Sequence, residues 1–120
     1  MVFFEDKMMY QLKGSVPEEE YTIPLGVADI KRTGTDITLV ATSSMVQVAL
    51  EAAGSLHEAD ISAEVIDVRT TVPLDKNTLI GSVRKTSRAI VVDEGYESYG
   101  VTAEIASVIA EGAFYYLDAP

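Results

Sequence analysis

Residues 37–44 decide the fold, and they read Ile37-Thr38-Leu39-Val40-Ala41-Thr42-Ser43-Ser44. The first five form a β-branched run that predicts a buried strand. The three hydroxyl side chains that follow can cap the first turn of a helix. Apolar residues then recur at helical spacing up to an expected helix end near Glu58, and they are Met45, Val48, Ala49, Ala52 and Leu56.

The same strand and helix pattern occurs twice more. Ala63–Val68 and Ala89–Asp93 predict buried strands, and Pro73-Leu74-Asp75 predicts a break and an N-cap between them. Two helix faces follow these strands, formed by Leu79, Ile80 and Val83 and by Val101, Ile105, Val108 and Ile109. Such alternation indicates βαβ units, so we expect an α/β fold with parallel pairing, right-handed crossovers and helices on both faces of the sheet. Upstream, the alternating segment Ala28–Arg32 predicts a half-exposed strand.

The last predicted helix is apolar nearly all round. Small residues occupy faces that a surface helix fills with charges, namely Ala103, Ala106, Ala110 and Gly112. We therefore expect burial on more than one side. Two interpretations remain open: a central helix of this domain, or a helix covered by a partner subunit.

Length and composition limit the possible functions. A chain of 120 residues predicts one domain, and the absence of cysteine excludes disulfides and thiolate metal sites. A formal net charge of -10 disfavours nucleic acid and anionic membrane surfaces. The longest apolar runs have the length of strands, so we expect no membrane span and no secretory signal. A reducing, cytoplasmic location is the expectation.

Ligands of open parallel sheets bind beyond the carboxyl ends of the strands. At these ends Thr42-Ser43-Ser44 could hold an anion or simply cap a helix, and Arg69 could grip a phosphate or pair with a strand-end acid such as Asp67. Asp93 and Glu94 could supply an acid or anchor a loop. His57, the only histidine, is interpreted as a surface residue near a helix end. No glycine-rich phosphate loop or metal-ligand spacing is present, and these residues alone complete no active site.

Several collinear motifs nevertheless resemble one enzyme family. They are Glu18-Glu19-Glu20-Tyr21-Thr22-Ile23-Pro24-Leu25-Gly26, Ala28-Asp29-Ile30-Lys31-Arg32, Glu64-Val65-Ile66-Asp67-Val68-Arg69-Thr70, Pro73-Leu74-Asp75, Val92-Asp93-Glu94-Gly95, Ala103-Glu104-Ile105-Ala106 and Leu117-Asp118-Ala119-Pro120. In this order they resemble the β subunit of the first component of 2-oxoacid dehydrogenase complexes, in its C-terminal transketolase-like domain. The pyruvate, branched-chain and acetoin enzymes share these motifs.

This resemblance implies a three-layer α/β/α fold with a mixed, mostly parallel sheet whose first strand, Ala28–Arg32, is antiparallel. It implies an enzyme that pairs α and β subunits, binds thiamine diphosphate and magnesium between them, and passes an acyl group to lipoamide on an acyltransferase core. The implied partners are an α subunit, a second β subunit and the lipoyl acyltransferase core. The residues that bind the cofactor and the metal lie in the α subunit and an earlier domain, so none is expected here and this chain alone is predicted to be inactive.

The resemblance also divides the chain. Residues 1–26 are expected to be the end of a preceding pyrimidine-binding domain and a linker, with a strand at Val2-Phe3-Phe4, and residues 27–120 the transketolase C-terminal-like domain without its last strand. Three residues are candidates for binding a partner: Asp118, Glu94 and Tyr99. Alternatives are an acetoin dehydrogenase β subunit, a stand-alone α/β module that binds a small ligand or a protein, and the matching domain of transketolase or deoxyxylulose-phosphate synthase.

The expected missing strand has a physical consequence. In the family it would pair beside Ala89–Asp93, so an apolar strand edge is expected to be exposed. Exposed edges recruit other chains. We therefore predict self-association through this edge.

Overall fold

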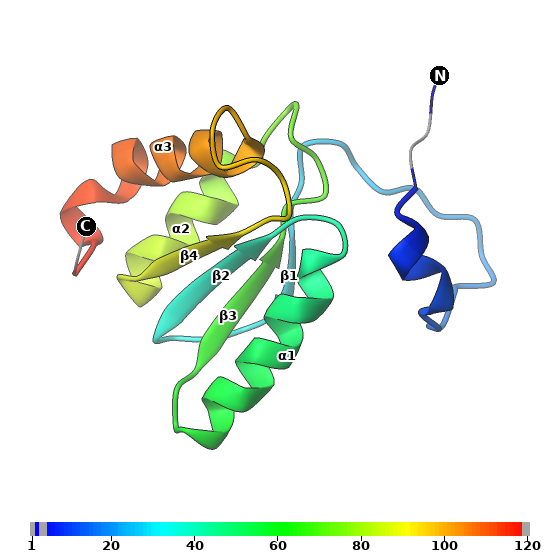
Figure 1. Cartoon of the computed structure of the whole chain (residues 1–120), viewed down its shortest axis with the longest axis horizontal. Helices are drawn as coiled ribbons and strands as arrows, with labels where there is room; N and C mark the ends of the chain where they lie inside the picture. The colour runs from blue at the N-terminus through cyan, green and yellow to red at the C-terminus, as the bar shows by residue number, and fades with distance from the viewer. Residues whose placement is uncertain (1, 3–4, 119–120) are drawn as a thin grey trace.

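The computed structural model describes residue 2 and residues 5–118 of the chain. Its four strands are β1 (Asp29–Arg32), β2 (Ile37–Ala41), β3 (Ala63–Asp67) and β4 (Ala89–Val92). Its three α-helices are α1 (Met45–Glu58), α2 (Lys76–Thr86) and α3 (Val101–Ala113), and two short 3-10 helices are η1 (Lys7–Gln11) and η2 (Phe114–Tyr116). Figure 1 shows the strands side by side with helices in front and behind. The predicted alternation of strands and helices is confirmed.

The sheet has the order β1-β3-β2-β4. β2 pairs parallel with β3 and with β4, and β1 pairs antiparallel with β3. The mixed sheet with an antiparallel first strand is therefore confirmed. The two central strands, β2 and β3, are largely buried as predicted, whereas β4, which was also predicted to be buried, lies at an edge with Ile90 50% exposed although all of its residues are apolar.

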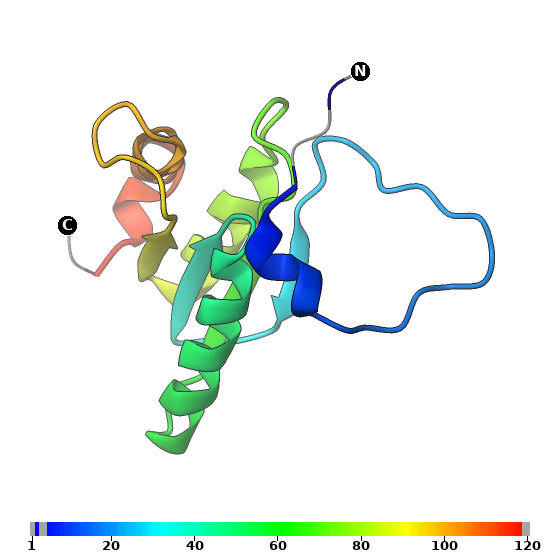
Figure 2. The same cartoon turned by 45° about the vertical axis from the view of Figure 1, so that its right-hand side comes forward.

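Two apolar layers flank the sheet, because neighbouring residues of a strand point to opposite faces. Leu39, Ala41 and Val65 pack against α1, together with Val46, Ala49 and Ala53 from that helix. Val40, Ile66 and Val68 face α2 and α3 on the other side. Figure 2 separates α1 from the other two helices. The α/β/α layering is thus confirmed.

The buried face of α1 differs from the prediction. Val46, Ala49 and Ala53 are buried, whereas Val48 is 48% exposed and Ala52 is exposed. Both sets have helical spacing and share Ala49, and Met45 and Leu56 of the predicted set are partly buried against the same core. The prediction that hydroxyls cap this helix is also wrong: Ser44 is the N-cap in a helical conformation without a side-chain hydrogen bond.

Helix α2 begins and ends as its sequence indicates. Asp75 is the N-cap and its carboxylate accepts the Thr78 N–H, which confirms the predicted cap. At the other end Ser87 adopts a left-handed conformation with φ 60°. Leu79 and Val83 are fully buried, so the predicted helix face is largely correct.

Helix α3 is buried on one side only. Ile105, Val108, Ile109 and Ala113 face the core, where the helix packs beside α2. The opposite side presents Ala103, Ala106 and Ala110 to solvent. The expectation of burial on more than one side is wrong for the isolated chain, because no described element lies over the small-residue side. Within the described residues α3 is therefore a surface helix with an uncovered small-residue side, and its interpretation as a helix covered by a partner subunit stays a prediction.

A buried carboxylate links the amino-terminal ends of β2 and β3 to α2. Glu64 is 1% exposed, and it accepts hydrogen bonds from the Ser82 hydroxyl at 2.5 Å and from the Lys85 ammonium. Ser82 also bonds Thr38, at 2.6 Å. Each buried polar group in this cluster therefore has a partner, as folding requires.

The segment before β1 has little regular structure. Residues 5–26 hold only η1, and their side chains are mostly exposed. Gly26 ends the segment with φ 76°, and its N–H donates to the Thr70 hydroxyl at 2.9 Å. The predicted strand Val2-Phe3-Phe4 lies largely outside the described residues. Within the described part of the chain, no helix is long and apolar enough to cross a membrane.

Candidate subunit interface

The carboxyl ends of the strands, where a ligand was expected, hold a cluster of four alternating charges. The Asp29 carboxylate lies 2.8 Å from the Lys31 ammonium and 2.6 Å from the Arg69 guanidinium. Asp67 adds longer contacts, at 3.7 Å to Lys31 and 4.0 Å to Arg69. The interpretation of Arg69 as the partner of strand-end acids is confirmed.

Arg69 is held in place by its own backbone. Its φ is 58°, in the left-handed region, and its N–H donates to the Asp67 carboxylate at 3.1 Å. The Lys31 hydrogen bond, together with the charges of Lys31 and Arg69, outweighs partial burial and lowers the pKa of Asp29. All four charges are thus engaged with one another, which leaves the arginine little freedom to grip an anion.

A hollow of about 610 Å³ lies beside this charge cluster. It is lined by Ile23 and Leu25 from the segment before β1 and by Thr42 and Ser43 from the segment after β2. The Thr42 hydroxyl donates to the Asp93 carboxylate at 2.7 Å, so it is already committed to joining the ends of β2 and β4. Glu94, next to Asp93, is exposed, and among the described residues its side chain has no hydrogen bond to the loop that it was expected to anchor.

These residues do not fit a diphosphate and magnesium site. No group of three or more histidine, cysteine or acidic residues in the described chain is arranged to hold a metal ion. The two basic side chains of the charge cluster are paired with carboxylates. His57 is exposed in the last turn of α1, as predicted for a surface residue.

The loop between β4 and α3 carries the most exposed aromatic residues near this end of the sheet. Tyr96 is 89% exposed and Tyr99 is fully exposed at 105%. Tyr99 has φ 61°, so a left-handed backbone presents its ring outward. A buried aromatic ring contributes much of the energy of a typical protein interface, and an exposed one is a candidate anchor.

Tyr99 shares a shallow hollow with a second exposed apolar residue. Val72, in the loop before α2, is 90% exposed, and it lines a space of about 280 Å³ with Tyr99, Val101 and Leu74. Sequence reasoning missed Val72, because one valine between Thr71 and Pro73 carries no pattern. We call Val72, Tyr99 and Val101 the apolar rim.

The structure separates the three candidate partner residues. Glu94 and Tyr99 belong to the loop that follows β4. Asp118 lies at the opposite end of that strand, where its carboxylate is 3.2 Å from the Arg88 guanidinium and its N–H donates to the Ser87 carbonyl at 3.0 Å. One partner surface can therefore contain the first two, while Asp118 belongs to another.

Fold and site together define an α/β domain that offers apolar surface for contact and lacks an assembled catalytic centre within the described residues. The family model for the transketolase C-terminal domain matches residues 26–120. The chain belongs to this family.

Curated relatives narrow the resemblance to particular subunits. The chain is 50% identical to the acetoin:2,6-dichlorophenolindophenol oxidoreductase subunit beta of Bacillus subtilis over 118 residues, which cover 98% of this chain and 34% of that one. It is 47% identical to the pyruvate dehydrogenase E1 component subunit beta of the same organism, covering 100% of this chain and 37% of that one. For the 2-oxoisovalerate dehydrogenase subunit beta the identity is 42%, with the same coverage. The chain thus spans about a third of the length of these relatives.

A solved structure agrees with the fold. A protein described as a split gene transketolase, inactive beta4 tetramer, superposes with a TM-score of 0.72 at 31% identity. The match covers 76% of this chain and 30% of the other. Both comparisons support the predicted family and fold class.

Proposed function

We propose that this chain is the C-terminal domain of the β subunit of a thiamine-diphosphate-dependent 2-oxoacid dehydrogenase, and that it serves subunit assembly. The observation that carries the proposal is an uncovered apolar rim on a domain whose charged groups at the strand ends are paired with one another. The relatives named above are all β subunits, which agrees with a role in a larger assembly.

In the whole enzyme the reaction is oxidative decarboxylation of a pyruvate-like 2-oxoacid with acyl transfer to lipoamide. Thiamine diphosphate and magnesium would be held by other parts of that assembly. Residues 1–26 are the end of the preceding pyrimidine-binding domain and its linker, and 27–120 are the C-terminal domain. The proposed partners are an α subunit, a second β subunit and the lipoyl acyltransferase core, in the cytoplasm.

An acetoin-cleaving enzyme is the second candidate. One specific observation favours it: the identity to the acetoin oxidoreductase subunit is 50%, against 47% for the pyruvate dehydrogenase subunit. The two candidates share the same role for this domain. Activity of the reconstituted enzyme on pyruvate and on acetoin distinguishes them.

Calorimetric titration of the chain with the α subunit from the same genome tests the assembly role. We expect binding that weakens about tenfold or more in Tyr99→Ala and in Val72→Ala, because each removes an apolar anchor. Tyr115→Ala is the matched control, since Tyr115 is 95% exposed but lies beyond the far end of α3. Equal affinities for all variants would exclude the apolar rim as the contact.

Titration with thiamine diphosphate and magnesium tests the other half of the proposal. We expect no heat from the chain alone, since its described residues do not form such a site. Saturable binding by the isolated chain contradicts the placement of the cofactor in other parts of the enzyme. For the α-subunit titration, the thermal midpoints of Tyr99→Ala, Val72→Ala and Tyr115→Ala distinguish the loss of a contact from the loss of the fold.

A further inference from the structure

The apolar rim is bordered by negative charge. Residues 89–118 contain acidic side chains but no lysine or arginine. Glu94 and Glu97 belong to the loop that carries Tyr99. Glu104, in the first turn of α3, lines the same hollow of about 280 Å³ as the three residues of the rim. No basic side chain lines this hollow.

The three glutamates are exposed, and they have no basic partner within ion-pair distance in the described part of the chain. The ion pairs found there join other residues, at the strand ends, between Glu64 and Lys85, and between Arg88 and Asp118. Unpaired like charges repel one another and attract a group of opposite sign. The surroundings of the apolar rim therefore favour a positively charged partner.

The exposed tyrosines offer a second means of binding a cation. The face of a tyrosine ring attracts a guanidinium group through its quadrupole, and the same planar group can pair with a carboxylate through two hydrogen bonds. An ammonium group lacks this planar fork. The chain already makes one such contact, because the Arg84 guanidinium carbon lies 5.0 Å from the centroid of the Tyr116 ring. Arginine thus matches both kinds of group at the rim, the ring of Tyr99 and the carboxylate of Glu104.

A second copy of this chain does not suit the rim. A twofold contact through this face brings the same surface of both copies together. It therefore places two sets of glutamates in one interface, and residues 89–118 supply no base to balance them. The occupant that the charges favour is a different polypeptide.

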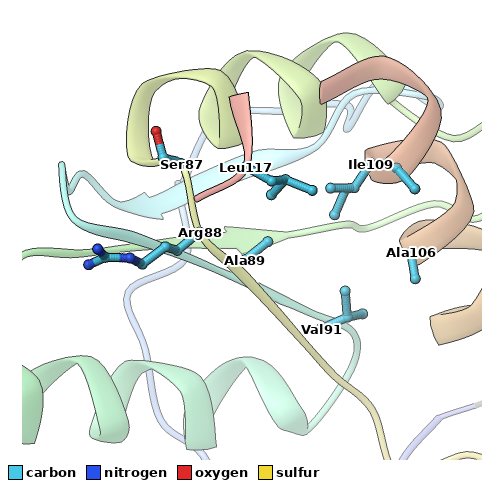
Figure 3. Close-up of a pocket in the computed structure, with 8 residues that line it drawn as sticks. Ser87, Arg88, Ala89, Val91, Ala106, Ile109 and Leu117 are labelled. Atoms are coloured by element: carbon cyan, nitrogen blue, oxygen red, sulfur yellow. The ribbon is translucent and has the colours of Figure 1, made fainter. Parts of the chain in front are cut away.

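The second hollow beside α3 differs in its charge. It encloses about 290 Å³ between β4 and α3, and Figure 3 shows Val91 on the strand facing Ala106 on the helix. Its only charged lining residue is Arg88, whose guanidinium lies 3.2 Å from the Asp118 carboxylate. No acidic residue lines this hollow, so a basic segment gains no ion pair there. Charge thus distinguishes the rim from the other apolar hollow of the same helix.

We propose that the apolar rim docks a segment of a partner polypeptide that presents an arginine next to an apolar side chain. The apolar side chain enters the hollow between Val72 and Val101. The guanidinium lies against the ring of Tyr99 and pairs with the Glu104 carboxylate, while Glu94 and Glu97 attract the segment from a greater distance. This inference rests on the proposed function, which supplies the α subunit as the partner.

Association kinetics with the α subunit test the charges. We expect Glu97→Lys and Glu104→Lys each to lower the association rate constant about threefold or more, because charges at the border of an interface act mainly on encounter. Raising the salt from about 0.05 to 0.5 M should slow association of the wild type more than that of either variant. Tyr99→Ala should instead raise the dissociation rate constant.

Glu51→Lys is the matched control, since it makes the same change in net charge on the exposed side of α1, across the sheet from α3. Its association rate constant should stay within about twofold of the wild type. Equal slowing by Glu51→Lys and Glu104→Lys would mean that only net charge matters and overturns the proposal. Glu97 lies in a loop, so Glu97→Lys keeps the test valid if Glu104→Lys lowers the thermal midpoint by disturbing the first turn of α3.

A peptide titration separates this inference from the proposed function. Amide shifts of the isotope-labelled chain are followed during addition of acetyl-Arg-Leu-Arg-amide, with acetyl-Lys-Leu-Lys-amide and acetyl-Glu-Leu-Glu-amide as controls. We expect saturable shifts in residues 94–104 with the arginine peptide, weaker ones with the lysine peptide, and none with the glutamate peptide. Glu104→Lys should abolish them and Glu51→Lys should not.

The two experiments can fail independently. An α subunit that does not bind, with shifts from the arginine peptide, contradicts the proposed function and supports the chemistry of the rim. An α subunit that binds with unchanged kinetics in Glu97→Lys and Glu104→Lys supports assembly and overturns this inference. The absence of shifts in residues 94–104 with the arginine peptide also overturns it.

Discussion

The backbone N–H of Ala28 donates to the carboxylate of Asp75 at 3.0 Å, although the two residues are 47 positions apart. The same carboxylate accepts the N–H of Thr78 at 3.1 Å and its hydroxyl at 2.7 Å. One side chain therefore caps α2 and fixes the approach to β1. Loss of this helix cap is therefore expected to loosen the start of the edge strand β1 as well as the first turn of α2.

Asp75→Ala is expected to lower the free energy of unfolding by about 1–2 kcal/mol, the usual effect of losing a helix cap. Burial acts to raise the pKa of Asp75, but hydrogen bonds from Ala28 and Thr78 outweigh it and the net pKa is lowered. The contribution of the carboxylate is thus present above its ordinary pKa near 3.8 and is lost as the pH falls through the lowered value. Urea denaturation at pH 7 and at pH 2 measures both effects.

Glu97→Ala, in the exposed loop before α3, is the control for Asp75→Ala and should change stability little. Amide exchange at Ala28 should accelerate in Asp75→Ala alone. An unchanged exchange rate at Ala28 would mean that the hydrogen bond to Asp75 does not restrain this segment.

Glu64→Gln probes the buried carboxylate. Burial acts to raise the pKa of Glu64, but hydrogen bonds from Lys85, Ser82 and the Gly34 N–H together lower it. We expect a loss of about 1.5–3 kcal/mol at pH 7, the range for hydrogen bonds to charged groups. The difference from the wild type should shrink as the pH falls below the ordinary value near 4.5 and through the lowered pKa. A difference that is constant from pH 7 to pH 2 contradicts a role for the charge.

The strand Ile37–Ala41 matches its predicted bounds because a β-branched run with turn residues on both sides carries its own boundary signal. The face of α1 was mispredicted at Val48 and Ala52, because two overlapping sets of apolar residues have helical spacing. Only packing against the sheet decides that Val46 is buried and Val48 is exposed. Strand order likewise depends on contacts between distant segments, and only the resemblance to a family indicated the antiparallel β1.

Like the fold, the candidate site could be predicted from the sequence only in part. The pairing of Arg69 with strand-end acids followed from their places after parallel strands, although Asp29 gives the closer contact. The exposure of Val72 had no sequence signal, since an apolar residue in a loop is buried or exposed according to its neighbours. The position of Asp118 at the opposite end of β4 from Glu94 depends on how the chain returns after α3.

Replacing Gly34 and Gly54 by alanine should change the free energy of unfolding in opposite directions. A Cβ at Gly34 would lie 2.2 Å from the backbone carbon of Ala63, so Gly34→Ala is expected to lose about 2–3 kcal/mol through overpacking. Gly54 lies within α1 with nothing within 4 Å of such a Cβ. Gly54→Ala should gain about 0.5–1 kcal/mol from helix propensity. Thermal and urea unfolding measure both, and equal effects of the two substitutions would contradict the close approach at Gly34.

The Thr42 hydroxyl joins the ends of β2 and β4 through the Asp93 carboxylate, at 2.7 Å. Thr42→Val keeps the shape but leaves that carboxylate unpaired, so we expect a loss of about 1–2 kcal/mol and faster amide exchange in residues 94–100. Because this loop carries Tyr99, affinity for the α subunit should also fall, although Thr42 is not part of the apolar rim. Thr35→Val is the control, since its hydroxyl bonds only the neighbouring Asp36, at 3.2 Å. Unchanged exchange in the loop, with unchanged affinity, would show that Asp93 positions neither the loop nor Tyr99.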